Sequence, residues 1–257
     1  MKNALALVAP LALAGCTVIP QPPPAETPVP ADGIARAAIG QRVYVDGPYV
    51  TPLDVSGAFP HRLERALAAG PVAAFQFRVK GVDQHEAARL AVPLQEICRA
   101  REVAFIVNDS IALAKRLAAD GVHLGQTDGS VREAREALGR EAQIGVTCHA
   151  SRHLAMAAGE AGADYVAFGS FFPSSTKASE HRAEPELLTW WQTLMEIPCV
   201  AIGGITPDNC GPLVDAGADF LAVSAAVWRG DEAEAVRAFV RRLDQSGSSS
   251  QAKEKSR

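Results

Sequence analysis

Two aspartates follow short apolar segments of the chain, in positions that suit magnesium chemistry. Asp109 follows residues 104–107, and Asp128 ends the polar turn after residues 121–124. Ligands of an α/β protein bind beyond the carboxyl ends of its parallel strands, so two carboxylates on such loops can converge. Magnesium takes one or two carboxylates and keeps water and substrate phosphate as its other ligands. The spacing therefore predicts a magnesium site at Asp109 and Asp128.

Cationic side chains accompany this predicted metal site. Arg78 and Lys80 alternate with Gln76, so the three should share the inward face of one strand, and Lys177 stands in a polar loop further along. Polar groups pointing into a barrel are costly without a partner. An anionic ligand bound together with the metal explains them. A structural network of ion pairs with the two aspartates is the alternative reading.

A second anion site is predicted from backbone groups. Gly203 and Gly204 follow the apolar residues 199–202, and Ser224 and Ala225 follow the next apolar segment. Glycines after the seventh strand of a barrel, with the loop after the eighth, form its usual phosphate site, where backbone N–H groups hold the anion. Two anion sites indicate one substrate with a diphosphate and one with a monophosphate.

The elements that would position these residues alternate between strand and helix. We expect strands at residues 49–51, 72–77, 104–107, 121–124, 143–147, 165–168, 199–202 and 220–224. We expect helices at residues 59–69, 84–101, 130–138, 152–161, 185–196, 209–216 and 232–243. Eight β/α units in about 200 residues predict an α/β protein with a single (β/α)8 TIM barrel. An open doubly wound sheet fits less well, because no glycine-rich dinucleotide turn follows the first strand.

The two ends of the chain do not fit this alternation. Residues 1–41 contain a charged start, an apolar run and the sequence Leu-Ala-Gly-Cys ending at Cys16, which resembles a bacterial lipobox, and then a proline-rich tether. The apolar run is too short to span a membrane. Residues 42–245 are the expected barrel. The Ser/Lys/Glu-rich residues 246–257 are expected to be disordered.

Composition excludes some classes of function. The chain of 257 residues has a formal charge of −4, which disfavours general nucleic-acid binding because that needs a basic face. Its five cysteines form no C-x-x-C pair, and most fall in expected core positions, which is typical of a reducing compartment. We therefore expect a cytoplasmic protein, with lipid anchoring through Cys16 as the alternative. The oligomeric state stays open, a homo-oligomer included.

Seven motifs, in this order and spacing, resemble the thiamine phosphate synthase family. They are QFRVK (76–80), VND (107–109), DGVHLGQTD (120–128), GVTCH (145–149), FPSSTK (172–177), AIGGI (201–205) and AGADFLAVS (216–224). The resemblance extends from about Tyr49 to about Leu243. It implies a (β/α)8 barrel that joins hydroxymethylpyrimidine diphosphate to thiazole phosphate and releases pyrophosphate with the help of magnesium.

The resemblance also implies roles in binding the pyrimidine diphosphate. Gln76 and Asn108 would contact the pyrimidine ring. The diphosphate would be bound by Arg78, Lys80, Asn108 and Lys177, with magnesium held by Asp109 and Asp128. Thr147 stands where the family usually has serine, and its hydroxyl can still donate to the leaving group. The residues expected to act in catalysis are Lys177, Arg78 and Thr147.

The thiazole phosphate would be bound at the other anion site. Its expected ligands are Ser174, Thr176, Gly204, and the backbone of Ser224 and Ala225, with Ser174 in place of a common threonine. No acid–base pair stands out, and loss of pyrophosphate can leave a stabilised pyrimidine cation that the thiazole nitrogen captures. His123 and His149 invite a general-base role, but a hydrogen bond from each ring to the backbone is at least as good a reading.

Two other functions remain as alternatives. A thiazole tautomerase-like relative would share the fold and the monophosphate site, but would not need the diphosphate-binding set. A non-catalytic lipoprotein binding module would rest on the Cys16 motif alone. Small-molecule substrates are thus the expected partners, and a membrane becomes one only if the lipobox is real.

Overall fold

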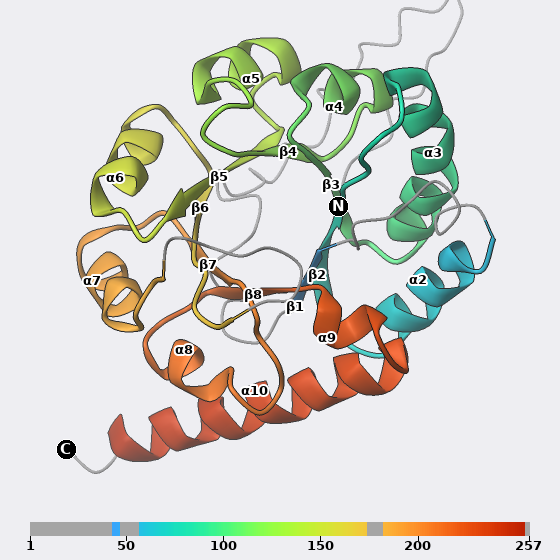
Figure 1. Cartoon of the computed structure of the whole chain (residues 1–257). Helices are drawn as coiled ribbons and strands as arrows, with labels where there is room; N and C mark the ends of the chain where they lie inside the picture. The colour runs from blue at the N-terminus through green and yellow to red at the C-terminus, as the bar shows by residue number, and fades with distance from the viewer. Residues whose placement is uncertain (1–42, 47–56, 174–181, 255–257) are drawn as a thin grey trace, which may run out of the picture.

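The computed structural model describes residues 43–46, 57–173 and 182–254 of the chain. In this part, parallel strands alternate with helices, and the curled sheet lies inside a ring of helices (Figure 1). This is the TIM-like α/β arrangement that the alternation of segments predicts. Three residues assigned to the predicted site, Ser174, Thr176 and Lys177, lie outside the described residues.

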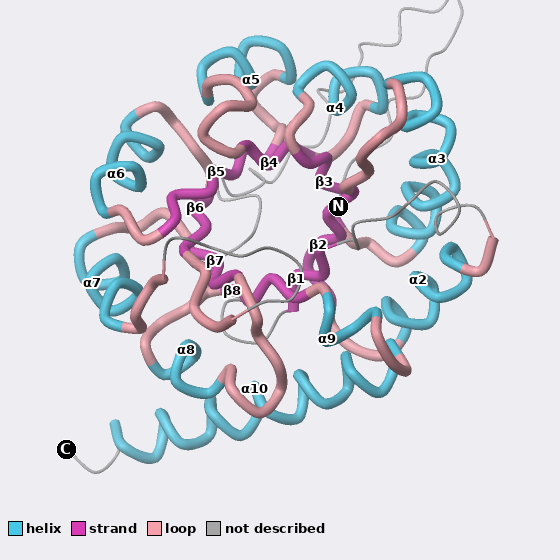
Figure 2. The backbone as a smooth tube through the Cα atoms, viewed as in Figure 1, coloured by secondary structure: helices cyan, strands magenta, loops and turns pink. Residues whose placement is uncertain are grey.

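Seven strands, β2 to β8, pair in sequence order, each parallel to the next. They are β2 (Val72–Phe77), β3 (Ala104–Asn108), β4 (Gly121–Leu124), β5 (Gln143–His149), β6 (Tyr165–Phe168), β7 (Cys199–Ile202) and β8 (Phe220–Val223). A further strand, β1 (Val43–Asp46), pairs in parallel with both β2 and β8, so the strand order returns to its start (Figure 2).

The position of the first strand differs from the prediction. The sequence analysis placed it at residues 49–51, which lie outside the described residues, whereas the backbone pairing belongs to Val43–Asp46. The segment Val43-Tyr44-Val45 is rich in β-formers and precedes a Gly-Pro pair, so it suits a strand better than residues 49–51, which Pro52 follows directly. The other predicted strands match within two residues.

The helices follow the strands around the outside of the sheet. They are α2 (Phe59–Ala68), α3 (Gln84–Ala100), α4 (Ile111–Leu117), α5 (Val131–Leu138), α6 (Arg152–Glu160), α7 (Glu186–Leu194), α8 (Gly211–Asp215), α9 (Ala225–Trp228) and α10 (Glu232–Glu254). Helix α10 continues beyond Ser246, where the composition predicts disorder. A helix anchored at its start adds one hydrogen bond per further residue, so it can extend into a segment that would not nucleate a helix alone.

Strand side chains alternate between two buried clusters. Phe75, Phe105 and Val107 belong to the large cluster between sheet and helices, while Ala74 and Ile106 belong to a small cluster. Because successive side chains of a strand point to opposite faces, the small cluster is the filling of the barrel interior. Gln76 and Asn108 share its parity, and they are placed to point inward at the carboxyl ends of β2 and β3.

Helix starts are fixed locally by polar caps. The Ser130 hydroxyl accepts a hydrogen bond from the Glu133 N–H, and the Glu133 side chain accepts one from the Ser130 N–H, which is the predicted capping box. The bond from the Ser130 N–H, and then a bond from the Ser130 hydroxyl, hold the pKa of the Glu133 carboxyl below its usual value. Ser110 and Ser151 cap α4 and α6 in a similar way. Each cap ends a strand-to-helix loop, so the caps help to fix where the loops leave the strands.

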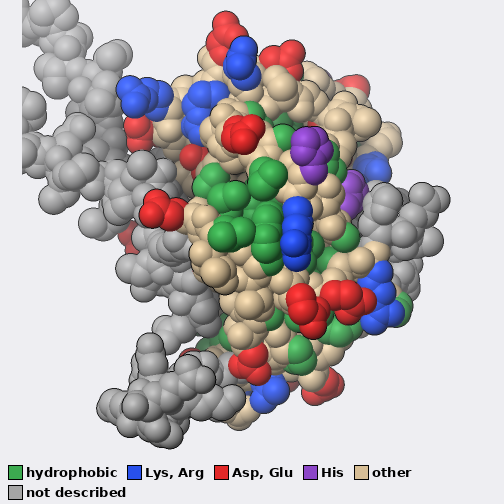
Figure 3. Space-filling view, turned by 90° about the vertical axis from the view of Figure 1, so that its left-hand side faces the viewer, with side chains coloured by type: hydrophobic (Ala, Val, Ile, Leu, Met, Phe, Trp, Pro, Cys, Tyr) green, Lys and Arg blue, Asp and Glu red, His purple; other side chains and the backbone are tan. Residues whose placement is uncertain are grey.

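The outer surface carries charges of both signs. On the side of the barrel formed by α6 and α7, acidic and basic side chains surround a few hydrophobic ones (Figure 3). Met156 and Leu194 are exposed hydrophobic residues of these two helices. Such isolated exposed residues are ordinary on a soluble surface. Within the described ranges, no helix combines the length and the apolar character needed to cross a membrane.

Candidate active site

The polar residues predicted from the sequence gather where β2, β3, β4 and β5 end. Gln76 lies near the end of β2, Asn108 is the last residue of β3, and His123 pairs in register with Asn108 from β4. Thr147 lies near the end of β5, two residues after Gly145, the register partner of His123. Gln76 and His123 are buried, whereas Asn108 and Thr147 are half-buried. The four side chains share the inward parity.

Arg78 and Asp128 lie close enough to Asp109 to influence the pKa of its carboxyl. Nε of Arg78 is buried and lies 3.9 Å from Oδ2 of Asp109, an ion pair too long for a hydrogen bond. Burial raises the pKa of the Asp109 carboxyl, and the neighbouring Asp128 charge raises it further, while Arg78 and Lys80 oppose the shift. Lys80 itself is exposed rather than inward. Two neighbouring carboxylates favour a cation between them.

Local backbone geometry fixes the two carboxylates. Asp109 has a left-handed φ of 66° directly after β3, and its N–H donates to the carbonyl of His123 at 2.8 Å. Asp128 closes its turn by accepting a hydrogen bond from the Gly125 N–H at 2.9 Å. Left-handed φ is uncommon for a residue other than glycine and tends to occur at functional sites. The turn thus holds Asp128 on the loop that faces Asp109.

His123 joins two hydroxyl groups inside the barrel. Its Nε2 lies 2.7 Å from Oγ1 of Thr147, and its Nδ1 lies 3.0 Å from the hydroxyl of Tyr165. The ring also stacks on that of Tyr165, with 5.5 Å between centroids. Burial, and secondarily the Arg78 charge, lowers the pKa of His123 to about 4, so the ring is neutral near pH 7. The predicted bond from this ring to the backbone is therefore wrong, because both ring nitrogens bond to side chains.

A glycine in β5 allows this contact between β4 and β6. A Cβ atom added to Gly145 would overlap the ring of Tyr165, its register partner on β6. Because position 145 has no side chain, the Tyr165 ring crosses over β5 and reaches His123. The sequence analysis missed Tyr165. The available signal was an inward-facing glycine at position 145 together with an aromatic residue at the first position of the next strand.

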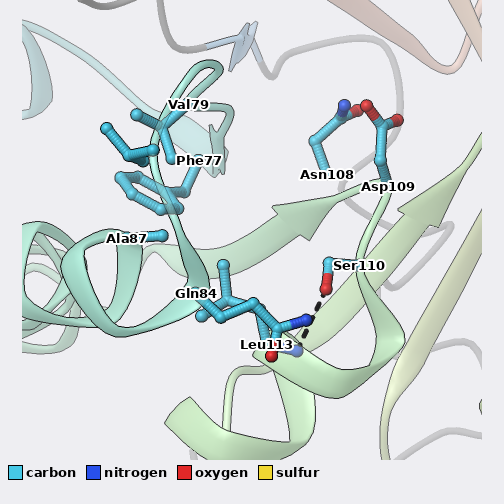
Figure 4. A pocket seen from close by; sticks show the side chains of 9 residues that line it. Phe77, Val79, Gln84, Ala87, Asn108, Asp109, Ser110 and Leu113 are labelled. Atoms are coloured by element: carbon cyan, nitrogen blue, oxygen red, sulfur yellow. Dashed lines mark hydrogen bonds between the residues drawn. The ribbon is translucent and has the colours of Figure 1, made fainter. Parts of the chain in front are cut away.

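A cavity of about 150 Å³ lies between the ends of β2 and β3 and the starts of α3 and α4. Phe77, Val79 and Leu113 contribute apolar walls, while Asn108 and Asp109 extend side by side from the end of β3 (Figure 4). Ser110, the α4 cap, lies below them. The cavity therefore opens next to the predicted diphosphate and metal residues, at the carboxyl end of the sheet.

The predicted monophosphate site has a firm backbone frame. Gly203 and Gly204 have left-handed φ values of 97° and 66°, and a Cβ on Gly204 would overlap the carbonyl oxygens of Phe172 and Pro173. Asn209 braces the turn by donating to the Gly204 carbonyl at 3.0 Å. Ser224 directly precedes the short helix α9, which begins at Ala225. The glycines are thus required by the loop after β6, whatever ligand the turn binds.

Among the described residues, no group of three or more His, Cys, Asp or Glu side chains is arranged to hold a metal ion. Zinc takes three or four protein ligands, whereas magnesium takes one or two carboxylates and completes its shell with water and phosphate. The pair of Asp109 and Asp128 therefore stays a prediction for a magnesium site.

A family model described as thiamine monophosphate synthase matches residues 49–227. The chain belongs to this family. A thiamine-phosphate synthase from Erythrobacter litoralis is 74% identical over 214 residues, which cover 82% of this chain and 99% of the relative. Another, from Rhodospirillum centenum, is 56% identical over 171 residues, covering 66% of this chain and 83% of the relative.

Solved structures of thiamine phosphate pyrophosphorylases resemble this chain as well. The thiamine phosphate pyrophosphorylase of Pyrococcus furiosus superposes with a TM-score of 0.71 at 27% identity, covering 82% of this chain and 98% of the other. That of Bacteroides thetaiotaomicron, at 18% identity and a TM-score of 0.57, supports the fold alone. All the predicted site residues lie within the region that matches the family model, whereas Cys16 does not.

Proposed function

We propose that this chain is a thiamine phosphate synthase. It joins 4-amino-2-methyl-5-hydroxymethylpyrimidine diphosphate to 4-methyl-5-(2-phosphoethyl)thiazole and releases pyrophosphate. The observation that carries the proposal is the 74% identity to a synthase over nearly the whole length of that relative. The gathering of Arg78, Asp109 and Asp128 at one edge of the sheet supports it. A tautomerase would not need this charged set.

The pyrimidine diphosphate would occupy the carboxyl ends of β2 to β5. In this proposal, Gln76 and Asn108 bind the pyrimidine ring, whose polar edge suits their inward amides. Arg78, Lys80, Asn108 and Lys177 bind the diphosphate. The position of Arg78, a guanidinium 3.9 Å from Asp109 at the end of β2, supports this role, since guanidinium groups bind phosphate oxygens well.

Asp109 and Asp128 would hold magnesium against the diphosphate. The raised pKa of the Asp109 carboxyl, due to burial and then to the Asp128 charge, supports this assignment because a cation would relieve both causes. When bound, magnesium supplies positive charge that offsets the charge of the leaving pyrophosphate. Magnesium use is implied by membership of the family rather than by a group present in this structure.

The thiazole phosphate would bind on the opposite side of the sheet opening. Gly204 and the backbone of Ser224 and Ala225 are its proposed ligands, together with Ser174 and Thr176 outside the described residues. The left-handed turn at Gly203 and Gly204, braced by Asn209, supports this site because such turns direct N–H groups toward an anion.

The chain's residues would act mainly by electrostatics and alignment. Arg78 and Lys177 would stabilise the departing pyrophosphate, and the Thr147 hydroxyl would donate a hydrogen bond to it. The loss of one well-placed donor of this type typically lowers kcat about 100- to 1000-fold. The carbon–oxygen bond to the diphosphate breaks first and leaves the pyrimidine methylene cation. The thiazole nitrogen then captures this cation and forms the carbon–nitrogen bond, and neither step needs a general base.

An assay of the full chain tests the proposed function. The purified protein is incubated with both substrates and magnesium, with and without a chelator, and thiamine phosphate and pyrophosphate are measured. We expect equal amounts of thiamine phosphate and pyrophosphate without the chelator, and neither product when the chelator is present. A folded protein that forms neither product would refute the proposal and favour a tautomerase-like or binding function.

Variants test the assignment of the diphosphate site. Lys177→Ala is expected to abolish turnover while the fold, followed by circular dichroism, is retained. Lys115→Ala, on the exposed face of α4, is the matched control and should keep the wild-type rate. Near-normal turnover of Lys177→Ala would show that the diphosphate site is assigned wrongly, even if the wild-type chain is an active synthase.

The proposal includes the organisation of the chain and its location. We assign residues 42–245 to a complete (β/α)8 barrel, and the backbone pairing of β1 with β2 and β8 supports this. Residues 1–41 form an extension outside the barrel, and residues 246–257 form a tail. We assign the enzyme to the cytoplasm. Metabolic labelling with a radioactive fatty acid tests this, because incorporation that a Cys16→Ala variant abolishes would establish a lipid anchor instead.

A further inference from the structure

The geometry points to a positioning role for Tyr165 and His123. We propose that these residues set the direction of the Thr147 hydroxyl, so that its hydrogen points into the site and donates to the departing pyrophosphate. This inference rests on the proposed function, and adds two residues to it. Neither residue needs to touch the substrate for this role, since both act through Thr147.

The three side chains form a continuous chain of short hydrogen bonds. The Tyr165 hydroxyl is 3.0 Å from Nδ1 of His123, and Oγ1 of Thr147 is 2.7 Å from Nε2 of the same ring. Both Tyr165 and His123 are buried, and Thr147 is half-buried at the inner end of the site. This series of hydrogen bonds thus leads from the interior of the barrel to the site.

The state of the imidazole decides what the Thr147 hydroxyl can do. A neutral imidazole has one donor and one acceptor nitrogen. If Nδ1 carries the proton, Nε2 must accept the hydrogen of the Thr147 hydroxyl, which then has none to offer to a ligand. If Nε2 carries the proton, it donates to Oγ1, and the hydroxyl hydrogen is available to the substrate.

The partners of His123 favour the productive tautomer. A phenol is a stronger hydrogen-bond donor than an alcohol, and its oxygen is the weaker acceptor. Tyr165 is therefore better placed to donate to Nδ1, while Thr147 is better placed to accept from Nε2. Both ring nitrogens then have a partner, with the Tyr165 hydroxyl donating to Nδ1 and Nε2 donating to Oγ1 of Thr147.

The absence of a side chain at position 145 supports a specific arrangement rather than chance packing. The Tyr165 ring crosses the space that a Cβ on Gly145 would occupy. Its hydroxyl thereby reaches a histidine two strands away, while its ring stacks on that histidine. The ring stacking would survive replacement by phenylalanine, so the hydroxyl can be removed with little change in shape.

Nuclear magnetic resonance gives a test that does not depend on activity. The full chain is labelled with ¹⁵N in its histidine rings, and the His123 signals are identified by their loss in a His123→Asn variant. We expect the proton on Nε2 in the wild-type chain, and a mixture of tautomers in Tyr165→Phe. A wild-type ring protonated on Nδ1 would overturn the proposal.

A double-mutant cycle tests the effect on catalysis. Tyr165→Phe should lower kcat about 10-fold, less than the loss expected from removing the donor itself, with the KM of each substrate nearly unchanged. In a Thr147→Val background the same substitution should have no further effect, since no hydroxyl is left to direct. In a Thr147→Ser background, which keeps the hydroxyl, the 10-fold loss should return.

The outcomes separate this inference from the proposed function. Equal losses from Tyr165→Phe with and without the Thr147 hydroxyl would refute positioning, although the chain would remain a synthase. A wild-type chain without turnover would refute the proposed function, and the NMR spectrum would still decide whether the ring holds the expected tautomer. A productive tautomer together with a non-additive cycle would establish the proposed role.

Discussion

Glu232, the first residue of α10, accepts a 3.0 Å hydrogen bond from Nε of Arg62 on α2, 170 residues earlier in the chain. The Glu232 side chain is only 4% exposed, and Nε of Arg65 lies 3.4 Å from its other oxygen. Arg62 also donates to the carbonyl of Trp228 at 2.7 Å. This buried carboxylate therefore ties the C-terminal helix to the first helix of the described chain.

Arg62→Met should destabilise the protein by about 2 kcal/mol, because it removes the main partner of a buried charge. The value is below that of a fully buried pair, since Arg62 is partly exposed and Arg65 remains. Urea unfolding measures the change. The matched control is Arg237→Met, which breaks an exposed pair with Glu234 and should change stability by less than about 0.5 kcal/mol. Equal effects would contradict the argument.

Gly145→Ala should destabilise the protein by about 2 kcal/mol and lower its turnover, because the new methyl group overlaps the Tyr165 ring. Gly230→Ala is the control, since a Cβ there meets no atom within 4 Å and its φ is not left-handed. Thermal unfolding and the synthase assay check both variants. A Gly145→Ala variant as stable as Gly230→Ala would show that the ring is free to move away.

Asp109→Asn should lower kcat about 100-fold and raise the magnesium concentration needed for half-maximal rate, because one of two charged ligands is lost. Asp215→Asn, at an exposed position of α8, should behave as the wild-type chain. Rates are measured over a series of magnesium concentrations. If Asp109→Asn retains the wild-type magnesium dependence, this carboxylate is not a ligand.

Stability should fall as the pH rises from 8 to 10, in part through Cys199. Burial, and then the nearby Asp219 charge, raises the pKa of this thiol to about 12. The unfolded chain then loses its thiol proton near pH 9 while the folded chain keeps it, so unfolding is favoured as the pH rises. This residue contributes a loss of about 1 kcal/mol by pH 10.

A Cys199→Ala variant tests that contribution. Urea unfolding at pH 8 and pH 10 should show a smaller drop in stability for the variant than for the wild-type chain. The stability that the variant loses through poorer packing is the same at both pH values, so it does not affect the comparison of the two changes in stability. An equal drop in the two proteins would mean that the thiol titrates alike in the folded and unfolded states.

Local patterns in the sequence were enough to predict most of the fold. Short apolar or β-branched runs predicted strands β2 to β8, and a serine followed by glutamate three residues later predicted the cap of α5. These signals arise from hydrogen bonds and side-chain burial over a few residues, so they can be read without the tertiary structure. The family could be identified in the same way, because its motifs are contiguous.

Other features depended on which strands become neighbours. The first strand was misplaced because the residues of a short strand are selected by pairing with β2 and β8, which are distant in sequence. The convergence of Asp109 with Asp128 could be predicted because consecutive parallel strands end on the same edge of a sheet. The contacts of His123 could not, since Tyr165 reaches it across β5.

The sequence by itself thus determined the class of fold, the family and the residue types available for binding two phosphorylated substrates. Only the tertiary structure decided how the neutral ring of His123 is bonded. That arrangement depends on the absence of a side chain at Gly145, on the register of three strands and on the burial of the His123 and Tyr165 rings. None of these is a property of any one segment, because each arises where segments distant in the sequence pack together.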